Sequence, residues 1–268
     1  MSLSKLRVVA LISFVVALGT LIIGGFFARH DIPPYPGEVA GPNGNVLFTG
    51  EDIFAGQDVY QRYGLMDHGS VWGHGSQRGS EFSAVSLHMM GEAVAERISH
   101  KEFGASYERL DQESKDVVAV RVAHEIKENR YDATADRLTL TAGQVAALEA
   151  VHRHWDKTFD KGDENYGFLP GTVRTAGERE QISRFFFWTA WAAGTNRPGD
   201  VSTYTNNWPP DQLVGNEASS ETYLWSIAGI ISLFLVLGLF IFLVHHYGIW
   251  YGKAKGVSIA NKLIEMPL

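Results

Sequence analysis

The segment GSVWGHGSQRGSEFSA, residues 69–84, gathers an unusual number of side chains capable of chemistry. Its four glycines let backbone N–H and C=O groups approach a ligand closely: Gly69, Gly73, Gly75 and Gly79. His74 and Arg78 offer hydrogen-bond donors to an anion, while backbone carbonyls suit a hard cation such as Ca²⁺. A surface loop with adaptable turns explains the same residues, so a binding loop and an ordinary loop both remain open.

Three histidines surround this segment and suggest a transition-metal site. His68, His74 and His88 would need a carboxylate or water to complete the coordination, and Glu81 is the nearest candidate. A metalloenzyme using these four residues is one functional hypothesis, although their spacing across a glycine-rich loop matches no known metal signature.

Two further pairs of histidines favour other interpretations. His152 and His154 lie two positions apart, so on a helix they point about 200° from each other and cannot share a metal ion. His245 and His246 follow a long apolar run. They are expected to be polar residues at a membrane interface, with a haem ligand as the alternative.

The chain contains no cysteine. This excludes disulfides, thiolate metal sites, cysteine nucleophiles and a Cys-x-x-Cys-His haem attachment. The sequence also lacks Gly-x-Ser-x-Gly, a phosphate-binding loop and His-Glu-x-x-His, and no pair of carboxylates stands out as an acid/base couple.

Two long uncharged runs must carry whatever site exists. Residues 8–27 and 223–244 hold no charged side chain, and each is long enough to cross a membrane as a helix. We predict spans at 8–27 and 223–246. The first run is longer than a signal-peptide core and is not followed by a small-x-small cleavage site, which favours an uncleaved anchor.

Basic residues predict the orientation of these spans. Lys5 and Arg7 precede the first span, and three lysines lie in the tail over residues 247–268, so both termini are expected to be cytoplasmic. Residues 28–222 would then form an outer domain. With 18 Lys and Arg against 29 Asp and Glu, its net charge of −11 argues against nucleic acid as a partner.

The outer domain is predicted to be mostly helical. Apolar spacing and threonine caps predict five helices: residues 50–63, 83–110, 111–132, 141–160 and 176–194. A short hairpin or extended arm is expected over 134–141. The third helix should direct six apolar side chains to the core: Val117, Val118, Val120, Val122, Ala123 and Ile126.

The fifth helix carries the motif RFFFWTAWA. It places Phe185, Trp188 and Ala192 on one face. Core packing is the simplest interpretation, and docking on another membrane helix bundle is the alternative.

Three ordered stretches resemble the N-terminal part of quinol-dependent nitric oxide reductases: AGQDVYQRYGLMDHGSVWGHGSQRGSEFSAVSLH, FFFWTAWAAGTNRPGD and TYTNNWPPDQLVGN. The resemblance implies an anchor, a periplasmic domain of cytochrome c-like fold without haem c, and a linking helix. It also implies a twelve-helix catalytic partner, similar to cytochrome oxidases, in the bacterial inner membrane. That partner would bind haem b, haem b₃ and a non-haem iron, take electrons from quinol and reduce two NO to N₂O.

The resemblance also assigns roles to the glycine-rich segment. In related cytochrome c-dependent enzymes, a Gly-Ala-Tyr segment helps to bind Ca²⁺ near the haem propionates. Here Gly75-Ser76-Gln77 takes that place, with an amide oxygen of Gln77 where the tyrosine would be. Four residues are then expected to line the seam with the large subunit: Trp72, His74, Arg78 and Glu81. Arg78 would pair with a propionate.

The sequence ends at LIEMPL, before the catalytic part that the resemblance implies. The chain is therefore expected to be either a separate small subunit or a truncated product, and to bind no cofactor alone apart from a share in the Ca²⁺ site. A subunit of a similar NO dismutase, which releases N₂ and O₂, and a two-span sensor are the remaining alternatives.

Overall fold

The computed structural model describes residues 3–247, which divide into two compact units that meet between Glu217 and Ala218. The predicted tail over 247–268 lies outside the described residues, except for Tyr247. Each unit is considered by itself.

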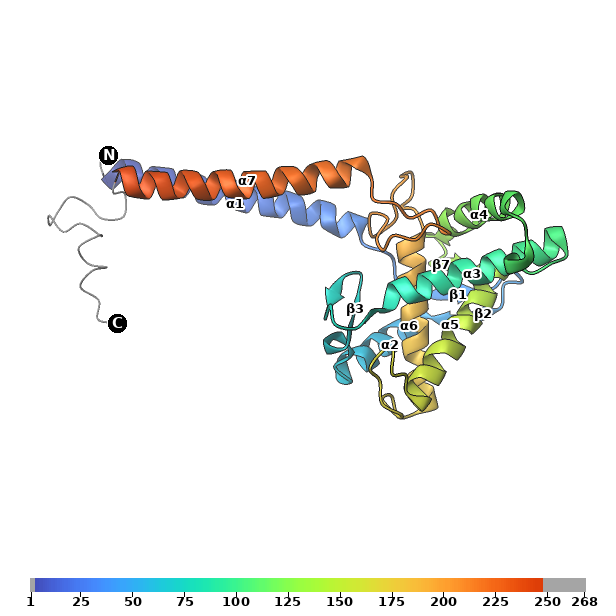
Figure 1. Ribbon diagram of the computed structural model, residues 1–268. Coiled ribbons are helices and arrows are strands. Elements are labelled where there is room, and N and C mark those ends of the chain that lie inside the picture. Colours follow the sequence, from blue (N-terminus) through green and yellow to red (C-terminus); the bar gives the residue numbers. More distant parts are fainter. Residues whose placement is uncertain (1–2, 248–268) are drawn as a thin grey trace. The chain divides into compact units, whose positions relative to one another are not determined.

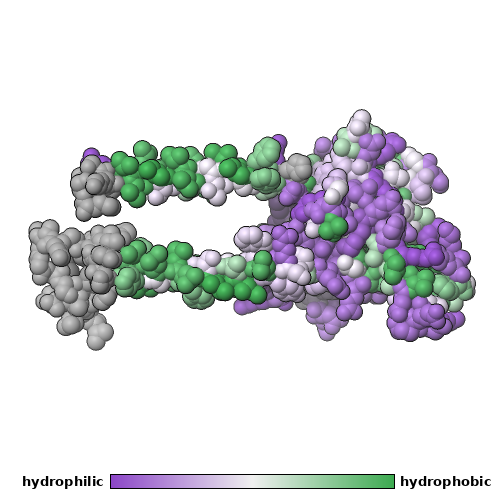
Figure 2. Space-filling model, turned by 90° about the horizontal axis from the view of Figure 1, so that it is seen from above, coloured by the Kyte–Doolittle hydropathy of each residue, from purple (hydrophilic) through white to green (hydrophobic). Residues whose placement is uncertain are grey.

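Two long apolar helices lie at the ends of the described chain. Helix α1 spans Leu3–Asp31 and helix α7 spans Ser220–Tyr247. Their most apolar stretches, Arg7–Arg29 and Ser220–Leu243, have 23 and 24 residues and bury none of their side chains within the protein. Figure 2 shows hydrophobic side chains covering both helices. This exposure distinguishes them from core helices of a soluble protein and indicates a two-span membrane protein.

Five helices form the domain between these spans (Figure 1). They are α2 (Gly50–Arg62), α3 (Phe82–Phe103), α4 (Gln112–Lys127), α5 (Ala142–Lys161) and α6 (Ala176–Gly194). Helix α6 packs against the other four, and α3 also packs along α5. The prediction of a mostly helical domain flanked by two apolar helices is confirmed.

Threonine capping boxes begin three of these helices. The side chain of Asp52 accepts a hydrogen bond from the backbone N of Thr49 at 2.8 Å, as the spacing of the two residues predicts. Thr141 with Gln144 and Thr175 with Glu178 form the same arrangement at α5 and α6. Local side-chain chemistry therefore fixes where these helices start.

Helix α3 ends earlier than predicted. It stops at Phe103 because Gly104 adopts a left-handed backbone with φ of 66°, which closes the helix. Only a short 3₁₀ turn, η2 (Tyr107–Arg109), follows before α4. The expected helix over 83–110 is therefore wrong in its last seven residues.

Helix α4 buries a narrower stripe than predicted. Val118, Val122 and Ile126, which are spaced four apart, are fully buried. Val117 and Val120 are instead exposed, so their predicted place in the core is wrong. Those two residues lie on the opposite side of the helix from the buried stripe.

A small sheet closes one side of the domain. It contains β1 (Glu38–Ala40), β2 (Val46–Thr49), β6 (Tyr131–Asp132) and β7 (Arg137–Thr139) in the order β2-β1-β7-β6. Strands β6 and β7 form a hairpin, which decides between the two alternatives for that region. The parallel pairing of β1 with β7 was not predicted, because strands of three residues give little periodic signal.

Aromatic rings fill the centre of the helical domain. Phe82 of α3 stacks on Phe186 of α6 at 4.8 Å, and Trp155 of α5 lies 5.1 Å from the Phe186 ring. The indole N–H of Trp155 donates to the Ser86 hydroxyl at 2.9 Å, which satisfies it inside the core. Since the aromatic residues of α6 are all buried, they pack the core, and the alternative of a docking face on this helix is wrong.

The segments that leave the two spans are both fastened to α6. The Trp188 indole N–H donates to the Pro34 carbonyl at 2.9 Å, and the Tyr35 ring stacks on Trp188 at 4.2 Å. Near the second span, the side-chain amide of Asn216 donates to the Ala193 carbonyl at 2.9 Å. One helix thus holds the chain just after the first span and just before the second.

Candidate functional site

The glycine-rich segment forms a small three-stranded sheet rather than a simple loop. Its strands are β3 (Gly69–Val71), β4 (His74–Gly75) and β5 (Ser80–Glu81), in the order β4-β3-β5. A 3₁₀ turn, η1 (Leu65–Asp67), precedes it, and α3 follows it directly. Strands of two or three residues interrupted by glycine are too short to be recognised from sequence.

The glycines let this segment pack on its own backbone. A Cβ atom at Gly79 would run into the carbonyl oxygen of His68. At Gly75, where φ is 138°, a Cβ atom would lie 2.9 Å from the Cα of Ser70. The close approach expected of these glycines is therefore an approach to residues 66–70 of the same segment.

Trp72 joins this small sheet to the core. Its indole N–H donates to the carbonyl of Thr189 on α6 at 2.9 Å, and its ring lies 5.4 Å from that of Trp188. Its backbone N–H donates to the Ser83 hydroxyl at 3.1 Å. Trp72 has a positive φ of 53°, an uncommon backbone for a bulky residue. Contacts on three sides of Trp72 hold it in this conformation.

Glu81 turns its carboxylate inward and caps α3. It accepts hydrogen bonds from the Ser83 hydroxyl at 2.6 Å, from the backbone N–H of Ala84 and from that of Gly73 at 3.4 Å. Burial raises the pKa of the Glu81 carboxyl above its usual value, although these hydrogen bonds favour the ionised form. The carboxylate is engaged in holding the sheet to the helix.

Three predicted site residues lie at the exposed tip of the sheet. His74, Gln77 and Arg78 are all exposed, whereas Trp72 and Glu81 are partly buried behind them. Nδ1 of His74 lies 3.1 Å from the Trp72 carbonyl oxygen. Within residues 3–247, no carboxylate lies within 4.0 Å of the Arg78 guanidinium. The tip presents an uncompensated cation on a firmly attached base.

The structure contradicts the three-histidine metal site. The His68 ring packs against Phe168 at 5.8 Å, and Nδ1 of His88 lies 2.9 Å from Asp211. His74 bonds within its own sheet. Among the described residues, no three His, Asp or Glu side chains are placed to hold a metal ion together. The metalloenzyme hypothesis is therefore wrong.

The other histidine pairs form no site in the described chain. The His154 ring meets Tyr166 edge-to-face at 5.7 Å, and burial lowers its pKa below the usual value. His152 lies on the same helix, partly buried. The surroundings of the His245 and His246 side chains lie outside the described part of the chain.

Two residues at this site were missed from the sequence. Ser83 is fully buried and links Trp72 to Glu81 through its hydroxyl. Its position two residues after a glutamate at a helix start was the only available signal. Trp208 lies beside Gly73, since a Cβ atom there would be 3.5 Å from the indole nitrogen. Its separation of 135 positions in the sequence gave no such signal.

Comparison with known proteins identifies the family of this domain. A family model that describes the cytochrome c-like domain of NorB, a nitric oxide reductase protein, matches residues 36–210. A search of curated proteins gives no match. The matched region contains all five helices of the domain and the glycine-rich sheet. Since it covers more than half of the chain, this protein belongs to the family of the NorB cytochrome c-like domain of nitric oxide reductases.

Proposed function

We propose that this chain is a non-catalytic part of a quinol-dependent nitric oxide reductase in a bacterial inner membrane. It covers the outer surface of a twelve-helix catalytic partner, which holds haem b, haem b₃ and non-haem iron and reduces two NO to N₂O. The family and the two apolar helices support this proposal. The basic residues that flank the spans support a periplasmic domain with both termini in the cytoplasm.

The exposed tip of the small sheet carries the proposal to particular residues. His74, Gln77 and Arg78 project from a base that Trp72 and Glu81 fix to α6 and α3. A cation without a carboxylate partner is suited to a haem propionate of the partner, because a charge-assisted bond gains most when the seam excludes water. Trp72 and Glu81 then support the contact from behind.

A calcium ion at this seam would need ligands from both partners. Ca²⁺ takes about six to eight oxygen ligands. This sheet offers the amide oxygen of Gln77 and backbone carbonyls such as that of Gly75, while the nearby carboxylate of Glu81 is already engaged. The described residues thus fit a minority share of such a site. Removing calcium by chelation should therefore loosen the complex and leave the isolated chain unaffected.

Purification of the tagged full chain from its native membrane tests the proposal. We expect a haem-bearing membrane protein to co-purify and the complex to consume NO with quinol as electron donor. Arg78→Gln should lower the yield of the complex and the rate of NO consumption. Arg109→Gln is the matched control and should change neither, because Arg109 is an exposed arginine on η2, away from the tip of the sheet.

Two results would contradict the proposal. Purification of the intact chain without any haem-bearing partner would remove its basis. Equal complex yield and activity for Arg78→Gln and Arg109→Gln would remove the proposed role of the tip. Release of N₂ and O₂ in place of N₂O would replace NO reduction by NO dismutation.

A further inference from the structure

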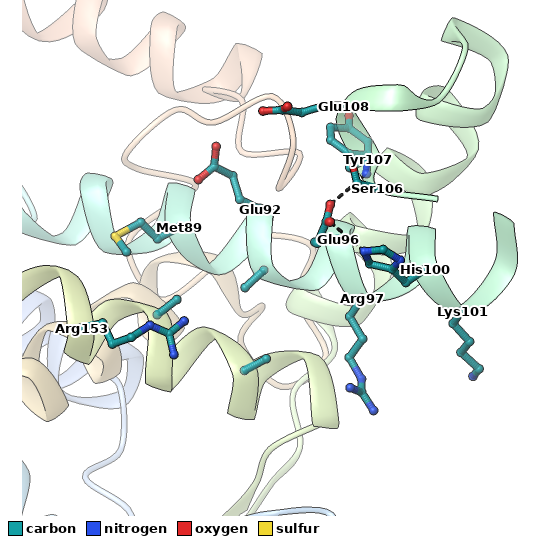
Figure 3. A pocket seen from close by; sticks show the side chains of 13 residues that line it. Met89, Glu92, Glu96, Arg97, His100, Lys101, Ser106, Tyr107, Glu108 and Arg153 are labelled. Carbon is teal, nitrogen blue, oxygen red and sulfur yellow. Dashed lines mark hydrogen bonds and ion pairs between the residues drawn. The ribbon is translucent and has the colours of Figure 1, made fainter. Parts of the chain in front are cut away.

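A furrow runs between α3 and α5 and is closed at one end by η2. Its volume is about 910 Å³, within the range of roughly 300–1,000 Å³ typical of ligand sites. Figure 3 shows Arg97 and Lys101 extending to one side of α3, with Glu92 and Glu108 on the other side. The family match and the proposed seam give this furrow no role.

Helical spacing gives the furrow an apolar floor that ends in two cations. Met89, Ala93, Arg97 and Lys101 recur every four residues, so they form one row along α3. Ala146 and Ala150 of α5 line the same hollow. Because alanine side chains are short, they leave room for the apolar part of a ligand between the helices.

The carboxylates of the neighbouring row are already engaged. Glu96 accepts from the backbone N–H of Tyr107 at 2.8 Å, and its other oxygen lies 2.9 Å from Nε2 of His100. Glu92 lies 3.4 Å from Nε2 of His88. These contacts reduce the capacity of the acidic row to neutralise the cations opposite.

Arg97 and Lys101 lack such partners. Across the described residues, no carboxylate lies within 4.0 Å of either cation, whereas Arg121, Arg179 and Arg184 all form ion pairs. Two unpaired cations four residues apart on one helix face repel each other, and an anion placed between them would relieve that repulsion.

The arrangement also favours one end of the furrow. Arg97 lines two adjoining hollows of about 470 and 400 Å³, so the space around its guanidinium is open on several sides. The start of α5, which would also attract an anion, is already occupied, because the Thr141 hydroxyl donates to the Glu125 carboxylate there. The anionic group therefore belongs at Arg97 and Lys101.

We propose that this furrow binds a small amphiphilic anion, a phosphate or carboxylate that carries a short apolar chain. Arg97 and Lys101 bind the anionic group, and the apolar chain lies on Met89, Ala93, Ala146 and Ala150. A free metabolite and an anionic lipid head group share this chemistry. The proposal goes beyond the role in nitric oxide reduction and does not depend on it.

Calorimetric titration of the full chain in nanodiscs of neutral lipid tests the site, with hexyl phosphate, inorganic phosphate and hexanol as probes. Hexyl phosphate should bind more tightly than either of the others. Arg97→Gln and Lys101→Gln should each weaken it about tenfold, the effect of losing one hydrogen bond to a charged group. Ala146→Leu fills the floor and should reduce hexyl phosphate affinity to that of inorganic phosphate.

Arg174→Gln is the matched control, because this exposed arginine lies on the loop before α6 and does not line the furrow. Its affinity should equal that of the unchanged chain. Phosphatidylglycerol nanodiscs distinguish the two sources: weaker apparent binding of hexyl phosphate identifies a lipid occupant, and unchanged binding identifies a free anion. Failure of the unchanged chain to bind hexyl phosphate, or equal binding by Arg97→Gln, would overturn the proposal.

Discussion

Replacing Trp72 by phenylalanine isolates the hydrogen bond that attaches the glycine-rich sheet to the core. The change keeps an aromatic ring beside Trp188 and removes the N–H that donates to the Thr189 carbonyl at 2.9 Å. Thr189 is fully buried, so its carbonyl loses a partner that water does not easily replace.

The expected cost of Trp72→Phe is about 1–2 kcal/mol, the sum of a lost hydrogen bond and an unsatisfied buried acceptor. Because the bond joins one small sheet to α6, most of this cost should appear as local opening of residues 69–81. A cost of that size raises the population of the opened state by a factor of about 5–30. The helices of the core should keep their protection.

Hydrogen exchange of the backbone amides measures this opening directly. The most informative amide is that of Ser76, which donates to the carbonyls of Met66 and Gly69 at 2.7 and 2.9 Å. Trp208→Phe is the matched control, because this half-exposed indole lies beside the same sheet and none of the described residues accepts a hydrogen bond from it. Equal exchange at Ser76 in both variants would refute the role given to Trp72.

Three further predictions concern the core, the glycines and pH. Phe186→Ala should destabilise the domain by about 3–5 kcal/mol through loss of the central ring, whereas Leu169→Ala at an exposed position should cost below about 0.5 kcal/mol; chemical denaturation measures both. Gly79→Ala should accelerate exchange at residues 69–81, because its methyl group displaces the His68 carbonyl; unchanged exchange would show that the segment adapts freely. Burial lowers the pKa of Lys127 to about 8, so the unfolded chain binds more protons between pH 8 and roughly 10.5 and stability should rise across that window by about 1–2 kcal/mol after solvent screening. Lys127→Met should flatten that rise in denaturation experiments, and parallel pH profiles for the two proteins would contradict the assignment.

Helix starts were predictable because their signals are local. Thr49 with Asp52 and Thr141 with Gln144 satisfy backbone N–H groups within one turn, and the structure contains both boxes. The end of α3 was harder to place, because Gly104 competes with apolar residues that continue beyond it. At such a position, backbone conformation outweighs hydrophobic spacing.

Residues that act through tertiary contacts were less predictable. Gly194 ends α6 as expected, yet it lacks a left-handed backbone, and a Cβ atom there would lie 2.6 Å from the Ile126 side chain. Glu81 looked available for a partner, but Ser83 and Ala84 engage its carboxylate. The sequence identified the right segment as a candidate site without showing which side chains turn inward.

The attachment of both membrane exits to α6 limits how this protein can be recombined with its relatives. Trp188 and Ala193, which hold Pro34 and Asn216, lie five positions apart on α6, so the two fastening points are separated by about 7.5 Å along its axis. A chimaera that exchanges α6 alone would mismatch both connections together. Helix, exit and return segments must therefore be transplanted as one block.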